Sequence, residues 1–250
     1  MGLNFDGFLA FRFKDGKIQP IEKVHIPNFE DLLHIDKQKE TLRKNTLKLV
    51  KGFPAQDVLL WGDRGTGKSS LVKSMLGLFG SEGLRIVQVY QMDIIHLSDL
   101  YQMIRSTQNK FIIFFDDLSF EEGDPQVNIL KSLLDGDVEE RPANAVVYVT
   151  SNRRNLLHQI EKAHKFPEED RIQTLSLVER FGIRLGFFSI GKQEYLDIVK
   201  SYAIKRNLNI QEELLFSMAL EWARERYGFS GRSAYQFIRY LEGELMLKSL

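Results

Sequence analysis

The fold is decided by residues 57–79, which read DVLLWGDRGTGKSSLVKSMLGLF. The first five letters are typical of a short buried strand, and Lys68 to Phe79 predict a helix. Between these two segments, Gly62 to Ser69 match the pattern G-x-x-x-x-G-K-[ST] without a mismatch. In this strand–loop–helix context the pattern predicts a phosphate-binding loop and not an ordinary glycine-rich turn.

The residue types of this loop suit a phosphate chain. Its three glycines let the backbone turn tightly and bring N–H groups against phosphate oxygens. The positive end of the following helix points at the same anion. Lys68 is expected to reach the β- and γ-phosphates, and the hydroxyl of Ser69 to bind Mg²⁺. The candidate nucleotide-binding residues are Gly62, Asp63, Arg64, Gly65, Thr66, Gly67, Lys68, Ser69 and Ser70.

Strands and helices alternate on the C-terminal side of the loop. Strands are expected at residues 85–90, 111–116, 145–150 and 185–190, and helices at residues 97–105 and 125–134. Apolar strands separated by helices predict an α/β fold, with a parallel sheet covered by helices on both faces. After Gly191 three amphipathic helices are expected, at residues 193–206, 212–226 and 230–247. These predict a small all-helical lid.

The N-terminal region carries different signals. Residues 11–20, FRFKDGKIQP, predict a hairpin that turns at Asp15-Gly16, which we interpret as a surface element. Residues 29–51 have helical periodicity and are followed by Gly52-Phe53-Pro54. We therefore expect a hairpin and lead-in helix over residues 1–52, an α/β core over 53–190 and the lid over 191–250.

A pair of acidic residues follows the apolar strand Phe111–Phe115. Asp116 falls at the carboxyl end of this strand, where open α/β sheets bind their ligands. We assign it to the Mg²⁺ site, through water, and Asp117 to orienting an attacking water. A solvated acidic loop is the alternative interpretation, and Glu121 or Glu122 would compete for the water-orienting role.

Polar residues also follow the strand AVVYVT. Asn152 is our candidate for a hydrogen bond to the γ-phosphate or to the attacking water, with Thr150 and Ser151 as alternatives. A helix N-cap would also explain Ser151 and Asn152, because both residue types are favoured there.

Two later arginines have guanidinium groups that would suit phosphate. Arg180 lies in the stretch ERFG at 179–182, and Arg232 lies in GFSGRSA at the start of the last predicted helix. The sequence by itself does not distinguish either of them from an ordinary surface arginine.

Composition limits the classes of protein that remain. Hydrophobic residues make up 43% of the 250 residues and charged residues 27%, as in globular proteins. There is no cysteine, so disulfides and thiolate chemistry are excluded. No apolar run approaches the length of a membrane span and no signal peptide is readable, so we expect a cytoplasmic protein without membrane contact. Lys+Arg and Asp+Glu are both 34, which does not favour nucleic acid as a partner.

The order and spacing of these motifs resemble the AAA+ P-loop ATPases. The chain is most similar to an uncharacterised bacterial family of AAA+ ATP-binding domains of unknown function. The similar stretches are LWGDRGTGKSSLVK, FIIFFDDLSFEEGD, VVYVTSNRRNL, ERFGIRLGF and GFSGRSAYQF, together with the lead-in FEDLLHIDKQKETLRKNT. They span about residues 25–250. The family's longer N-terminal region would make this chain a piece of a longer protein.

The resemblance implies roles that the residues alone do not give. Arg180 would be an arginine finger that completes the site of a neighbouring subunit in a homo-oligomer, and Arg232 a second sensor that reaches the γ-phosphate. Leu33 and Ile35 would border the adenine of ATP. The chain departs from the family pattern at His34, where many members have Gly, and at Glu179, where the pattern has Asp.

The activity that the resemblance implies is Mg²⁺-dependent ATP hydrolysis, coupled to remodelling or regulation of an unidentified protein partner. One alternative is a DNA-directed ATPase similar to replication initiators and helicase loaders. Another is a nucleotide-dependent binding switch with little hydrolysis. The balanced charge favours a protein partner over DNA. Residues 91–110 contain no aromatic–apolar–glycine loop of the kind that threads polypeptides.

Overall fold

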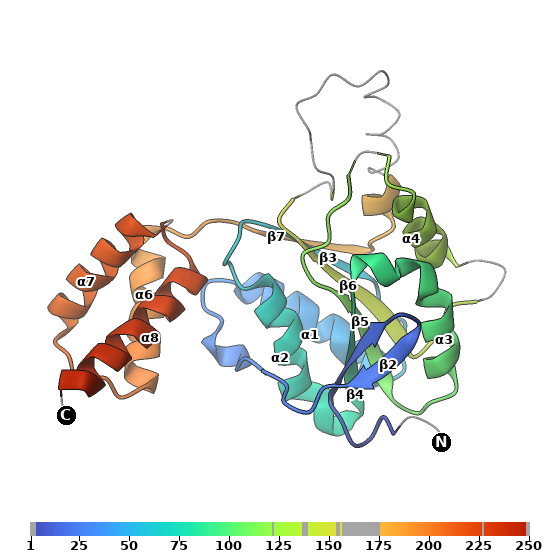
Figure 1. The fold of residues 1–250 in the computed structure, drawn as a ribbon, viewed down its shortest axis with the longest axis horizontal. Coiled ribbons are helices and arrows are strands. Elements are labelled where there is room, and N and C mark those ends of the chain that lie inside the picture. The colour runs from blue at the N-terminus through green and yellow to red at the C-terminus, as the bar shows by residue number, and fades with distance from the viewer. Residues whose placement is uncertain are drawn as a thin grey trace.

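Strands from the whole length of the α/β region join in one seven-stranded sheet of order β2-β1-β4-β5-β6-β3-β7 (Figure 1). The computed structural model describes residues 4–121, 123–136, 140–153, 156, 176–226 and 228–248. The strands are β1 (Ala10–Lys14), β2 (Lys17–Pro20), β3 (Val58–Gly62), β4 (Leu84–Val89), β5 (Lys110–Phe115), β6 (Ala145–Ser151) and β7 (Ile183–Phe187). All neighbouring strands are parallel except β1 and β2. The predicted parallel α/β fold is confirmed.

The helices cover both faces of this sheet and then form the lid. They are α1 (Asp36–Val50), α2 (Lys68–Phe79), α3 (Leu97–Arg105), α4 (Gln126–Asp135), α6 (Lys192–Lys205), α7 (Glu212–Glu225) and α8 (Gly231–Lys248). Short 3-10 turns are η1 (Phe29–Asp31), η2 (Gly80–Glu82) and η3 (Gln91–His96). None of the helices within the described ranges is both long and apolar enough to cross a membrane.

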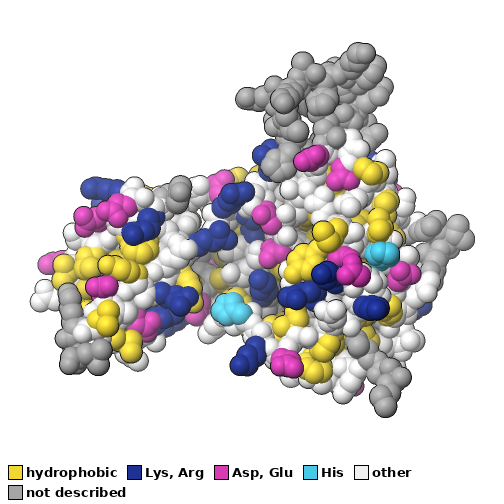
Figure 2. All heavy atoms as spheres, viewed as in Figure 1, with side chains coloured by type: hydrophobic (Ala, Val, Ile, Leu, Met, Phe, Trp, Pro, Cys, Tyr) yellow, Lys and Arg dark blue, Asp and Glu magenta, His cyan; other side chains and the backbone are white. Residues whose placement is uncertain are grey.

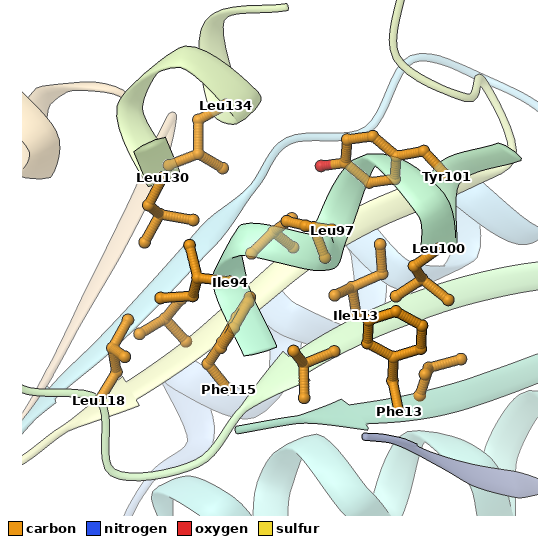
Figure 3. Close-up of a cluster of buried hydrophobic side chains, with 14 of the residues drawn as sticks. Phe13, Ile94, Leu97, Leu100, Tyr101, Ile113, Phe115, Leu118, Leu130 and Leu134 are labelled. Carbon is orange, nitrogen blue, oxygen red and sulfur yellow. The ribbon is translucent and has the colours of Figure 1, made fainter. Parts of the chain in front are cut away.

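The alternation of side chains along the strands builds two cores. In β5, Phe111, Ile113 and Phe115 point to the face covered by η3, α3 and α4, while Ile112 and Phe114 point to the face covered by α1 and α2. Figure 3 shows side chains of η3, α3 and α4 converging on Ile113 and Phe115 of the sheet. Burial on both faces explains why these strands are continuously apolar.

The N-terminal hairpin forms as predicted, but its interpretation as a surface element is wrong. β1 pairs with β2 through a turn in which Asp15 and Gly16 both have positive φ. β1 also pairs in parallel with β4 and so extends the sheet. Phe11 and Phe13 of β1 are fully buried in the core. The hairpin is therefore part of the sheet.

Two predicted segments have different bounds in the structure. The helix expected from residue 29 begins only at Asp36, since His34 has φ +61°, a left-handed conformation that ends helical geometry and favours Gly. The imidazole of His34 lies 3.3 Å from the carboxylate of Asp197 on α6. The last strand is Ile183–Phe187 and not 185–190.

The connections place β3 at a reversal of the sheet. The chain leaves β3 through α2 for β4, which lies on one side, while β7 pairs on the other side of β3. Open α/β sheets bind ligands at such a switch point, beyond the carboxyl ends of the strands. The carboxyl ends of β5, β6 and β3 are neighbours there.

The last three helices have a hydrophobic cluster of their own. It includes Tyr195, Val199, Ala219 and Phe237 from α6, α7 and α8. Figure 1 shows these helices beside the sheet-containing part, on the side where α1 and α2 lie. The predicted helical C-terminal region is confirmed.

Candidate functional site

The loop between β3 and α2 depends on its glycines. Gly62, Gly65 and Gly67 all have positive φ. At Gly62 a Cβ atom would lie only 1.9 Å from the carbonyl oxygen of Phe187. The loop therefore runs directly against the end of β7. It leads into the first turn of α2, whose N–H groups have no partner within the helix and suit an anion.

Lys68 is the buried cation of this loop. Its side-chain Nζ donates to the carbonyl oxygens of Gly62 (2.7 Å) and Asp63 (2.6 Å), and to Oδ1 of Asn152 (3.2 Å). Burial lowers the pKa of Lys68 to about 8; the nearby charges of Asp117 and Asp63 act in the opposite direction, while Arg232 lowers it further. The lysine is thus still mainly protonated at neutral pH and close to its titration range.

The side chain of Asp116 contacts Ser69 at the start of α2, so a carboxylate and a hydroxyl lie together beside the loop. Ser69 Oγ donates to Asp116 Oδ1 over 2.5 Å, and Thr150 Oγ1 donates to the same oxygen over 2.8 Å. Lys73 Nζ lies 3.8 Å from Asp116 Oδ2. Hydroxyl and carboxylate oxygens are the hard donors that Mg²⁺ prefers, usually together with water and phosphate oxygens. Ser69 and Asp116 therefore fit the predicted metal site.

Asp117 and Asn152 form the exposed side of the site. Asp117 has φ +59°, and its backbone N–H donates to Thr150 Oγ1 over 2.9 Å. The side-chain amide of Asn152 donates to the carboxylate of Asp117. Asn152 thus contacts both Lys68 and Asp117, while Thr150 holds both aspartates. The other alternative, Ser151, is buried and accepts from the N–H of Arg153. Glu122, weighed as a competing base, lies outside the described residues.

The start of α8 contacts the phosphate-binding loop. The backbone N–H of Arg232 donates to the carbonyl of Gly65 over 3.2 Å, and a Cβ atom at Gly65 would lie 3.0 Å from Ser230 Oγ. Figure 2 shows Lys and Arg side chains, interspersed with acidic ones, around the recess between the helical part and the sheet-containing part. The backbone of Arg232 therefore lies beside the phosphate-binding loop.

The two predicted adenine neighbours separate in the structure. Ile35 is buried in the core beneath α2, and its Cδ1 would lie 3.6 Å from a Cβ atom at Gly67. Leu33 instead packs against the hydrophobic cluster of the lid. Leu32, in the same lead-in segment, also approaches Gly67. The lead-in segment therefore contacts both the loop and the lid.

Arg180 is held in an ion pair of its own. Its Nε donates to Asp135 Oδ2 at the end of α4 over 2.7 Å, and Nη1 donates to the carbonyl of Ser176 over 2.5 Å. Neither partner is among the residues that contact Lys68. The structure thus brings Lys68, Ser69, Asp116, Asp117, Asn152 and Arg232 together and gives Arg180 separate partners.

Two residues at the site escaped the sequence reasoning. Lys73 lies one helical turn after Ser69 on α2, and its i, i+4 spacing from Ser69 places both residues on the same face of the helix. Ser189 donates to Asp63 from a position 126 residues away, and nothing in the local sequence indicates this contact.

A glycine-rich loop at the switch point of a parallel sheet, with acidic and polar strand ends beside it and a helical C-terminal region, defines the P-loop fold of the AAA+ type. The chain belongs to the family described as "Protein of unknown function (DUF815)", whose model matches residues 6–245. No curated protein matches its sequence.

Solved structures agree on this fold. A variant of RuvB from Thermotoga maritima is 17% identical, with a TM-score of 0.60 over 89% of this chain and 66% of that chain. The T. maritima RuvB Holliday junction branch migration motor is 18% identical, with a TM-score of 0.55 over 85% and 63%. The Aeropyrum pernix ORC1 protein in complex with DNA is 15% identical, with a TM-score of 0.61 over 89% and 65%. The chain spans just under two thirds of the length of these proteins. At such identities the likeness shows the fold alone.

Proposed function

We propose that this chain binds ATP with Mg²⁺ and hydrolyses it, and that turnover drives changes in a macromolecular partner. The observation that carries the proposal is the convergence of a buried cation, two carboxylates and a polar amide on one loop. Lys68, Asp116, Asp117 and Asn152 are linked to one another or to the loop by hydrogen bonds.

The side chains divide the work of phosphoryl transfer to water. Bound Mg²⁺ would neutralise charge on the β- and γ-phosphates, held by Ser69 directly and by Asp116 through water. Lys68 would bind the same phosphates as a cation. Asp117 would orient a water whose oxygen attacks the γ-phosphorus, and would accept its proton as the bond to the β-phosphate oxygen breaks. Asn152 would hold the carboxylate of Asp117 in place.

Two arginines would complete the site. Arg232 would reach the γ-phosphate from the lid. Because this contact would be lost when the γ-phosphate leaves, the lid would move during turnover. Arg180 would act in the site of a neighbouring subunit in a homo-oligomer, a contribution that can reach about a thousandfold or more. In the single chain the guanidinium of Arg180 pairs with Asp135.

An unidentified protein is the partner we propose, in a cytoplasmic setting. DNA is the second candidate, because the similar structures include a branch migration motor and a protein in complex with DNA. The equal numbers of basic and acidic residues favour the first. Titration of the chain with duplex DNA at several salt concentrations separates them, because a DNA-directed protein binds more weakly as salt rises.

The test of the proposed activity is phosphate release from ATP by the purified chain. We expect release in Mg²⁺, none in excess chelator, and none from Lys68→Ala prepared in parallel. ATP binding by the parent without any release at high protein concentration would instead support the nucleotide-dependent switch.

A further inference from the structure

The side chain of Asp63, inside the phosphate-binding loop, holds the segment that leaves the sheet after β7. Both the backbone N–H and the Oγ of Ser189 donate to Asp63 Oδ2, over 2.7 Å and 2.5 Å. The backbone N–H of Asp63 donates to the carbonyl of Phe187 over 2.9 Å. The bonds from Ser189 lower the pKa of Asp63, so it is a carboxylate at neutral pH.

Ser189 lies between two hydrophobic cores. Phe187 is fully buried in the core formed with α1 and α2, whereas Ile190 packs against the cluster of the lid. Phe188 and Ser189 between them are exposed, and Gly191 caps the first lid helix, α6. Phe188 packs edge-on against Trp61 at the end of β3, so the part of the link that belongs to neither core is Ser189, which Asp63 holds.

Asp63 also touches the lysine of the loop, through a different part of the residue. Its backbone carbonyl accepts from Lys68 Nζ, while its carboxylate accepts from Ser189. Further along the loop, the carbonyl of Gly65 accepts from the N–H of Arg232 on α8. The loop is therefore joined to the lid at its hinge and at the start of its last helix.

We propose that Asp63 and Ser189 are a positioning pair that couples the phosphate-binding loop to the hinge of the lid. This inference rests on the proposed function, because the event that the pair would transmit is the binding of ATP phosphates to the loop. A change in the loop backbone on binding would be transmitted through the Asp63 carboxylate to the link, and would rotate α6 to α8 against the sheet.

The chain contains no cysteine, which allows the lid to be followed directly. Exposed Ser81, on η2, and exposed Glu221, on α7, are replaced by Cys and labelled with a donor and an acceptor dye. Energy transfer is measured with and without Mg²⁺–ATP in the parent, in Ser189→Ala and in Ser189→Thr. The threonine variant is the matched control, because it keeps a hydroxyl donor. ATP affinity is measured calorimetrically on the same samples.

We expect ATP to change energy transfer in the parent and in Ser189→Thr. In Ser189→Ala the change should fall below about half of the parent value, while ATP affinity stays within about tenfold, the effect of one ordinary hydrogen bond. Asp63→Asn should reduce the change in energy transfer by a similar amount. Because the two residues act through one contact, Asp63→Asn combined with Ser189→Ala should reduce it no further than the more affected single variant.

Three results would overturn the proposal. One is a full lid response in Ser189→Ala. Another is an equal loss in Ser189→Thr, which would make the position structural. The third is a parent that binds ATP without any lid movement. A parent that does not bind ATP at all would contradict the proposed function itself, and the calorimetry separates that case from the others.

Discussion

The side-chain amide of Asn152 donates a hydrogen bond to the carboxylate of Asp117, and its oxygen accepts one from Lys68 over 3.2 Å. One neutral side chain at the end of β6 thus links the cation of the loop to the exposed carboxylate after β5. The arrangement keeps opposite charges close without a direct ion pair. Asp117 is exposed to solvent, whereas a phosphate oxygen would replace one of the three acceptors that surround Lys68 Nζ.

Asp117→Asn should retain ATP binding and lose turnover. The substitution removes the carboxylate charge but nearly keeps the shape, and the contacts of Asp116 with Ser69 and Thr150 do not involve this side chain. We expect a loss of about a hundredfold or more in phosphate release, typical of a missing general base. Calorimetry and a phosphate assay on the same sample check both halves. Unchanged turnover would assign the water-orienting role to another group, such as Glu121.

ATP affinity should fall as pH rises through about 8. Burial lowers the pKa of Lys68 to about 8, so the ammonium is protonated below this pH and is lost above it. Because only the charged form attracts phosphate, the association constant should decline from pH 8 upward, by up to about tenfold per pH unit. Calorimetry between pH 7 and pH 9.5 measures this, with circular dichroism as a control for folding. A flat profile in a folded protein would mean that Lys68 does not carry the binding.

Mixing two inactive variants should restore ATPase activity if Arg180 works in trans. A subunit with Arg180→Ala keeps Lys68 and Asp117, and a subunit with Lys68→Ala keeps Arg180. In equal random mixtures about a quarter of interfaces would join an intact pocket to an intact arginine. Turnover per subunit of the parent should also rise with protein concentration. No rescue at any ratio, together with concentration-independent turnover, would place Arg180 in its own chain's site or in a structural role.

Asp57→Ala should destabilise the sheet without touching the nucleotide site. The carboxylate is buried and accepts from both terminal nitrogens of Arg141, over 2.6 Å and 2.9 Å, and from the N–H of Val147. Its removal leaves a half-buried guanidinium without a carboxylate, with the carbonyl of Leu134 among its remaining hydrogen-bond acceptors, which costs about 3 kcal/mol. Urea unfolding measures the loss. The control Asp99→Ala removes an exposed carboxylate paired with His96 and should change stability by under about 0.5 kcal/mol. Equal midpoints for the two variants would contradict the assignment.

Local chemistry was readable in the sequence where it depends on neighbouring residues. The glycine-rich loop, the helix Lys68–Phe79 and the pair Asp116-Asp117 are each defined within a short stretch. The predicted last strand, 185–190, extends beyond the observed end at Phe187, because Phe188 and Ile190 are apolar without belonging to the strand. Phe188 packs edge-on against Trp61, and Ile190 packs against the lid. Hydrophobic pattern alone does not say which core a residue joins.

Contacts between distant segments were not readable. β1 pairs with β4, and no local pattern says which edge of the sheet a hairpin joins. The ion pair between Arg180 and Asp135 joins residues that are 45 positions apart in the sequence. The left-handed backbone at His34 was likewise invisible, since non-glycine residues seldom adopt it. The resemblance to a family with Gly at this position was the only indication of a turn there.

The central claim is that the loop from Gly62 to Ser69 binds the phosphates of ATP. Calorimetric titration of Mg²⁺–ATP into the parent and into Lys68→Ala tests it most directly. Lys68 would donate charge-assisted hydrogen bonds to the phosphates, so its removal should weaken binding by at least about thirtyfold while circular dichroism stays unchanged. Equal affinities for ATP in the parent and in a folded Lys68→Ala variant would contradict the account.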